Sequence, residues 1–220
     1  APMPLWYFRF YFRSLFHLVV ALSHFSVVRD ASLALRQLLF DSATSVSDVD
    51  FGIDNLATHI SLDPPTDEIG DESLLSVYLY HIGPDANLRN QSHLPVGTAG
   101  LINPPLALRL SYLITPLLSS EALNQMLLGR VMQALHDQPL ITSLAGQPMG
   151  DSNGGGSPAI RVWMEPLALE ELTRIWHALG TDYRLSLAYQ LRVVLIDSAI
   201  PPRSADRVVA SHLSLERKEA

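Results

Sequence analysis

The stretch PPLALRLSYLIT, residues 104–115, alternates between apolar and mainly polar side chains with the two-residue period of a β-strand. Arg109, Ser111 and Thr115 fall on one face. The opposite face carries only apolar or aromatic side chains, namely Leu106, Leu108, Leu110, Tyr112 and Ile114. Two prolines precede this segment and Pro116 ends it. The pattern predicts a strand with one face turned toward a core, followed by an amphipathic helix.

The segments on either side of this strand predict three helices and three further strands. Apolar residues at helical spacing predict helices over 26–41, over 120–137 with Met126 on the buried face, and over 169–179, ended by Gly180 as a C-cap. Strands are predicted over 74–82, 160–164 and 184–196. The first should be buried on both faces. The last should turn six side chains inward: Leu185, Leu187, Tyr189, Leu191, Val193 and Leu195.

The order of these elements predicts an α+β fold, in which a small mixed or antiparallel sheet packs with about three helices. Residues 83–105 read as a long irregular connection, and residues 146–158 as an exposed, glycine-rich loop. We place the domain at residues 26–200. The two prolines after Ile200 predict that residues 201–220 leave the sheet as a tail that contacts a partner.

The aromatic-rich residues 1–25 form a segment of their own. Arg9 and Arg13 interrupt the apolar run, which stays shorter than the ~20 residues that a membrane-spanning helix needs. The segment also lacks the clean three-part pattern of a secretory signal. It could be an interfacial helix or lie upstream of the true start. We favour the second interpretation because domain-like periodicity begins near Val28.

Composition excludes several functions. A net charge of −7 argues against a nucleic-acid binder that works by neutralising phosphates. The absence of cysteine excludes disulfides, thiolate nucleophiles and zinc–sulfur sites. Lys218 is the only lysine among 15 basic residues, and the arginine bias fits either buried interfaces or genomic base composition. Between Gln37 and Leu88 there are ten acids and no lysine or arginine, which predicts an acidic surface.

One motif raises the possibility of an enzyme. Gly150, Ser152 and Gly154 match the G-x-S-x-G pattern of a hydrolase nucleophile elbow, and Asp182 or Asp197 and then His212 follow in the chain order of that fold. An elbow needs a strand leading into the serine and a helix leaving it, whereas this serine stands in a glycine-rich run. We therefore interpret the motif as a loop and keep a serine hydrolase as the alternative function.

Other chemistry-bearing residues have simpler interpretations. Asp48, Asp50 and Asp54 alternate as calcium ligands can, but His59 stands where an EF-hand has glutamate, so a solvated acidic edge is favoured. The histidines show no metal-binding spacing. His81 is predicted to be a hydrogen-bonded core residue. Three aromatic residues are also assigned to the core: Tyr112, Trp163 and Trp176. We expect no catalytic residues, metal or cofactor.

Five segments, taken in order, resemble one family. They are LLSVYLYHIGPDANLRNQ, PPLALRLSYLITPL, LLGRVMQALHDQPLI, EPLALEELTRIWHALGTDYRLSLAYQLRVVLIDS and PPRS, and the resemblance covers roughly residues 26–205. Together they are similar to the tail terminator, or cap, proteins of phage-tail-like contractile injection systems of the antifeeding-prophage and virulence-cassette type.

The resemblance implies a fold similar to phage tail terminators and a structural function. Such a protein would form a six-membered ring on the end of the inner tube and sheath, terminate assembly and stabilise the extended sheath. Nucleic acid and membrane would not be partners. Assembly would take place in the bacterial cytoplasm, within a particle that can be released. Arg109 would then lie at a subunit joint or under a covering helix, and the sequence leaves both open.

Overall fold

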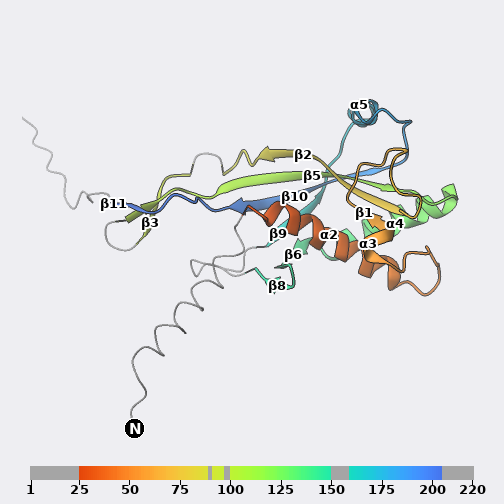
Figure 1. The fold of residues 1–220 in the computed structure, drawn as a ribbon, viewed down its shortest axis with the longest axis horizontal. Coiled ribbons are helices and arrows are strands. Elements are labelled where there is room, and N and C mark those ends of the chain that lie inside the picture. Colours follow the sequence, from red (N-terminus) through yellow and green to blue (C-terminus); the bar gives the residue numbers. More distant parts are fainter. Residues whose placement is uncertain (1–24, 89–90, 97–99, 150–158, 205–220) are drawn as a thin grey trace, which may run out of the picture.

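The computed structural model describes residues 25–88, 91–96, 100–149 and 159–204. Its centre is a mixed six-stranded sheet with the strand order β1-β2-β5-β10-β9-β6 (Figure 1). The strands are β1 (Ile60–Ser61), β2 (Leu75–Pro84), β5 (Leu106–Pro116), β10 (Leu187–Ile196), β9 (Ile160–Met164) and β6 (Leu140–Ile141). Only β1 and β2 pair in parallel. The prediction of an α+β fold with a mixed or antiparallel sheet is confirmed.

The opening strand, β5, lies in the middle of this sheet between β2 and β10. Tyr112 stands opposite Leu79 on β2 and Tyr189 on β10. The predicted inner face is confirmed for four residues, Leu108, Leu110, Tyr112 and Ile114, which belong to the buried core. Leu106 is 54% exposed because it begins the strand where β5 extends past the helices (Figure 1).

The other face of β5, for which the sequence left open a subunit joint or a covering helix, is covered along part of its length. Ser111, Leu113 and Thr115 are all buried. A helix covers this part of the face, and Figure 1 shows that helix, α5 (Leu169–Leu179), on the side of the sheet opposite to α2 and α4. A sheet covered on both sides buries polar as well as apolar side chains.

Three helices lie on the core side of the sheet: α2 (Val27–Thr44), the four-residue α3 (Leu56–His59) and α4 (Glu121–Asp137). The predicted helices over 26–41 and 120–137 are therefore confirmed, with α2 three residues longer at its end. Met126, predicted to be on the buried face, is instead 47% exposed. The third predicted helix is α5. Gly180 ends it with φ +70°, the left-handed conformation that glycine adopts without strain.

Two strands depart from simple alternation because each contains a bulge. In β10 the register shifts between Leu191 and Val194, so Val194 enters the core in place of Val193. In β2 the register shifts between Leu79 and His81. The prediction that this strand is buried on both faces holds for residues 75–77 only.

Two predicted core residues prove to be exposed, while two others are confirmed. His81 follows the bulge of β2 and is exposed, so its prediction as a core histidine is wrong. Trp163 is 55% exposed, because it lies on a part of the sheet face that α5 does not cover. Tyr112 and Trp176 are buried as predicted.

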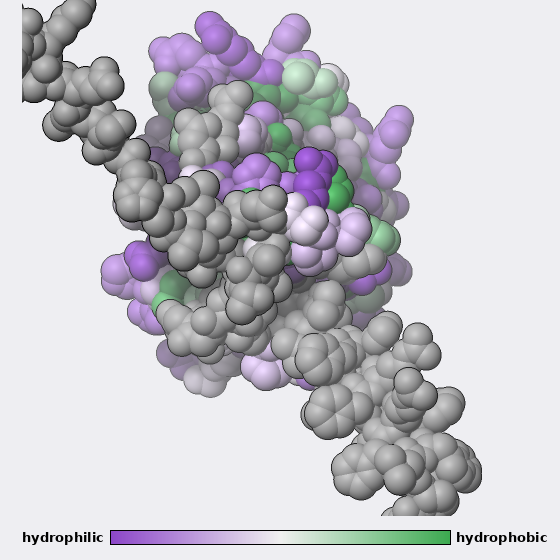
Figure 2. All heavy atoms as spheres, turned by 90° about the vertical axis from the view of Figure 1, so that its left-hand side faces the viewer, coloured by the Kyte–Doolittle hydropathy of each residue, from purple (hydrophilic) through white to green (hydrophobic). Residues whose placement is uncertain are grey.

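The predicted irregular connection contains a hairpin, β3 (Leu94–Val96) and β4 (Gly100–Ile102). After its two prolines the chain leaves the main sheet as expected, but it pairs again through β11 (Arg203–Ser204), which completes a three-stranded sheet in the order β11-β4-β3. This small sheet lies at the left-hand end of Figure 1, away from the helices. Figure 2 views that end, where the described residues are mainly hydrophilic with smaller hydrophobic areas between them.

Candidate interaction surfaces

Most of the residues on which the serine hydrolase alternative depends are not described by the structure. Ser152, its flanking glycines and His212 lie outside the described residues. Of the two candidate acids, Asp182 precedes β10 and Asp197 follows it. The two carboxyl groups therefore lie at opposite ends of a ten-residue strand, and one site could use only one of them.

The alternating aspartates are engaged in local contacts. Asp50 Oδ1 accepts a hydrogen bond of 2.8 Å from the Gly52 backbone N–H and closes a turn. Asp54 lies 3.2 Å from His59 Nδ1. Across the described ranges, no group of three or more His, Asp or Glu side chains is arranged to hold a metal ion.

Nine of the ten acids between Gln37 and Leu88 are exposed, and only Asp85 is buried. We call the exposed acids the acidic edge. It surrounds the end of α2, α3 and the loops on either side of β1, and consists of Asp41, Asp48, Asp50, Asp54, Asp63, Asp67, Glu68, Asp71 and Glu72. The only arginine that pairs with it among the described residues is Arg184, 3.6 Å from Asp67. The edge therefore carries a large uncompensated negative charge.

Three arginines from three neighbouring strands form a row on the sheet face that carries α5. Arg161 on β9 stands directly opposite Arg192 on β10. Arg109 on β5 lies opposite the β10 bulge, next to Arg192. Like charges directly opposite each other destabilise a sheet. We call Arg109, Arg161 and Arg192 the arginine row.

A single buried acid offsets part of this charge. Asp85 is 1% exposed, and its Oδ2 accepts a 3.1 Å hydrogen bond from Arg192 Nε and forms a 3.1 Å ion pair with Arg192 Nη2. Burial raises the pKa of Asp85, but the Asn87 backbone N–H and Arg192 together hold it below its ordinary value. Asp85 is therefore a carboxylate at neutral pH, and the row keeps a net positive charge.

A cleft of about 350 Å³ lies between Arg109 and α5, and it is lined by both polar and apolar side chains. Tyr80 donates a 3.0 Å hydrogen bond to Glu165, which also accepts one from Gln190. Burial, followed by the neighbouring Glu165 charge, raises the pKa of Tyr80, so its hydroxyl remains protonated. Arg109 is half-buried at the rim, and its Nε is buried without a hydrogen-bond partner. The cleft can thus accept a polar side chain.

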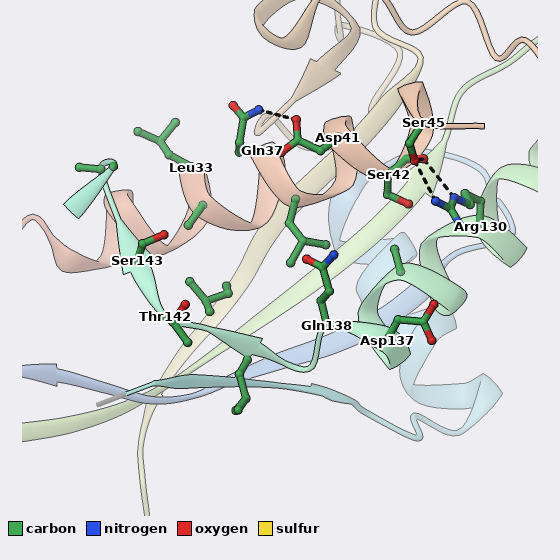
Figure 3. A pocket seen from close by; sticks show the side chains of 17 residues that line it. Leu33, Gln37, Asp41, Ser42, Ser45, Arg130, Asp137, Gln138, Thr142 and Ser143 are labelled. Atoms are coloured by element: carbon green, nitrogen blue, oxygen red, sulfur yellow. Dashed lines mark hydrogen bonds between the residues drawn. The ribbon is translucent and has the colours of Figure 1, made fainter. Parts of the chain in front are cut away.

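A larger groove of about 670 Å³ runs between α2, the end of α4 and the strands β6 and β7 (Ser143–Leu144) (Figure 3). Arg130 joins the two helices across one end of it. Its Nε donates to the Ser42 carbonyl and its Nη2 to Ser45 Oγ, each over 3.0 Å. Leu38 and Ile141 contribute apolar surface to the lining, whereas Gln37 is polar. A groove with this lining is better suited to binding a protein segment than to catalysing a reaction.

No helix in the described part of the chain is long and apolar enough to cross a membrane. Sequence reasoning predicted the acidic edge but missed the arginine row. The predominance of arginine among the basic residues was the one sequence signal for this row. The three arginines become neighbours only through the pairing of β5, β10 and β9. Those strands are far apart along the sequence.

Comparisons with known proteins identify a sequence family and solved structures that are similar to this chain. The sequence family described as the Pvc16 N-terminal domain matches residues 30–210. A search of curated proteins found no match. Among solved structures, the chain is similar to the sheath/tube terminator of an extracellular contractile injection system in its extended state, with 22% identity and a TM-score of 0.54. That likeness covers 87% of this chain and 64% of the other.

A second solved structure, the tube-terminating cap of the anti-feeding prophage, is 23% identical with a TM-score of 0.50. The likeness covers 83% of this chain and 59% of the cap. The chain thus spans about three fifths of the length of these two structures. At such identities the likeness establishes the fold.

Proposed function

Because the chain belongs to the Pvc16 N-terminal domain family, we propose that it is a structural cap on the tube and sheath of a contractile injection particle. The observation that carries this proposal is the family match over residues 30–210. The fold shared with a sheath/tube terminator and a tube-terminating cap supports it.

The proposed mechanism is assembly termination. A tube and sheath that grow by adding identical rings have no intrinsic end, because every layer presents the surface that the next layer binds. A cap that binds this surface and offers no equal surface beyond it stops growth, and it stabilises the end that it occupies. We propose a ring of six copies, since head-to-tail contacts close into a ring when the rotation between copies allows it.

The inner tube and sheath proteins are the proposed partners, and the proposed role is not enzymatic. In this proposal residues 26–200 form the capping domain, residues 201–220 contact a partner, and residues 1–25 stand apart from the domain. Assembly is assigned to the bacterial cytoplasm, from which the cap travels with the particle. The serine hydrolase gains no support from the described residues, which contain neither Ser152 nor His212.

Deletion of the gene tests the proposal. Without the cap, growth lacks its stop and the extended sheath loses its stabilised end. Electron micrographs should therefore show particles of widely scattered length, or contracted and broken sheaths, with intact baseplates. Returning the gene should restore a narrow length distribution and a density of six copies at the end away from the baseplate.

Two further observations complete this test. Complementation with Ser152→Ala should restore particles as well as the unaltered gene does, whereas a hydrolase built on Ser152 would lose its function. Particles of normal length, stability and capped appearance in the deletion strain would rule out the proposal that this protein is the cap.

A further inference from the structure

The arginine row carries positive charge that the described residues neutralise only in part. Asp85 forms its ion pair with Arg192, and its negative charge also acts on the nearby Arg109 without a direct contact. Arg161 is exposed, and neither it nor Arg109 forms an ion pair within 4.0 Å among the described residues. The Nε of Arg109 is buried and has no hydrogen-bond partner in the described part of the chain, a costly state for a charged group.

The acids of the neighbouring cleft do not supply this missing partner. Glu165 already accepts hydrogen bonds from Tyr80 and Gln190. Glu171 accepts one of 3.0 Å from the Ala168 backbone N–H, at the start of α5. An acidic group that pairs with Arg109 or Arg161 must therefore be one other than Glu165 and Glu171.

Trp163 marks the same surface as a protein contact. It stands on β9 opposite Gln190, two residues from Arg161, and 55% of it is exposed. Tryptophan and arginine are the residues most enriched at the energetic centres of protein interfaces. An exposed tryptophan beside unpaired arginines fits an acidic protein surface better than a small anion.

The chain itself carries such an acidic surface at the other end of the same strand. β2 starts at Leu75, paired with Ile60 of β1 at the acidic edge, and Gly83 near its end stands opposite Arg109. These positions are eight residues apart, or roughly 26 Å at the rise of a strand. Within one copy the two surfaces cannot meet, but a neighbour placed head to tail brings them together.

We propose that the arginine row and Trp163 of one copy bind the acidic edge of a second copy. The contact is heterologous, because it joins two different surfaces, and repetition of it produces a ring or an open chain. This inference rests on the proposed function, for which it names the joint between copies. Complementary charge also favours the correct register and speeds encounter.

Charge reversal on each side of the joint tests this inference with the full-length chain. Arg161→Glu alters the row without removing a side-chain hydrogen bond or ion pair among the described residues. The triple variant Glu68→Arg, Asp71→Arg, Glu72→Arg alters the acidic edge at three exposed positions that have no side-chain partner among the described residues. Each variant should self-associate about 10- to 100-fold more weakly than the unaltered chain in sedimentation velocity.

A mixture of the two variants provides the decisive measurement. Each variant keeps one natural surface, and the two reversed surfaces complement each other, so the mixture should recover association. Arg29→Glu is the matched control. It reverses an exposed arginine on α2, away from both surfaces, and should leave association unchanged.

Three results would overturn the inference: an unaltered chain that stays monomeric at every concentration tested, normal association of Arg161→Glu, or a mixture that stays dissociated. An Arg29→Glu loss equal to that of Arg161→Glu would also overturn it, since it would reveal a general charge effect. None of these results removes the cap proposal, which depends on particle length in the deletion strain. Binding of the row to a tube or sheath protein instead would appear as loss of docking with normal self-association.

Discussion

At the scale of single residues, Asp85 and Arg192 show how a buried charge depends on its partner. Asp85 is almost fully buried, and Arg192 both donates a hydrogen bond to its carboxylate and forms its only ion pair among the described residues. Replacing Arg192 with Met leaves that carboxylate uncompensated. We expect a loss of about 2 kcal/mol in the free energy of unfolding, below the usual cost of breaking a buried pair because Arg192 is one-third exposed. Urea denaturation of the monomer at neutral pH measures it.

The pH dependence of the free energy of unfolding and a second ion pair, Arg29–Asp30, provide the controls. Because the folded pKa of Asp85 is lowered, its stabilisation is complete above the unfolded pKa and is lost as the pH falls below about 4. Arg192→Met should flatten that acid-side loss. Arg29→Met removes a shorter but exposed pair with Asp30, and should cost at most about 1 kcal/mol. Equal losses for both variants would contradict this account.

At the scale of the element, α5 depends on one side chain. Trp176 is the only buried residue of this helix, its Nε1 donates a 3.3 Å hydrogen bond to Ser186 Oγ, and its ring meets Tyr183 edge-on at 6.1 Å. Trp176→Ala should therefore lower the free energy of unfolding by about 3–5 kcal/mol. Chemical denaturation and amide hydrogen exchange over α5 measure the change.

Leu169 on the same helix is the control. It is 63% exposed, so Leu169→Ala should change the free energy of unfolding by less than about 0.5 kcal/mol. A Trp176→Ala variant as stable as Leu169→Ala would mean that α5 is held by contacts other than this tryptophan.

At the scale of the whole molecule, the buried core of the described residues lies within a limited part of the chain. Its buried members run from Val27 to Val194, and they join α2, α4 and the central sheet. A chain of residues 22–204 should therefore unfold cooperatively, with a free energy within about 1 kcal/mol of the full chain. Calorimetry compares the two. Loss of the cooperative transition would show that a removed segment belongs to the folding unit.

Local pattern predicted much of this fold, because local physics decides it. The spacing of apolar residues placed α4 within one residue of its observed start, since an amphipathic face requires a period near 3.6. Gly180 identified the end of α5, because few other residues adopt a positive φ without strain. The alternation in β5 identified its inner face, because successive side chains of a strand point to opposite faces of the sheet.

Tertiary structure decided everything that depends on which strands become neighbours. The bulge that puts Val194 rather than Val193 into the core arises from the pairing of β10 with β5. Whether Trp163 is buried depends on how far α5 reaches over the sheet. The composition alone revealed an acidic stretch, whereas the arginine row needs three strands drawn from distant parts of the chain. Long-range pairing is set by the energy of the whole packed molecule, and no local period encodes it.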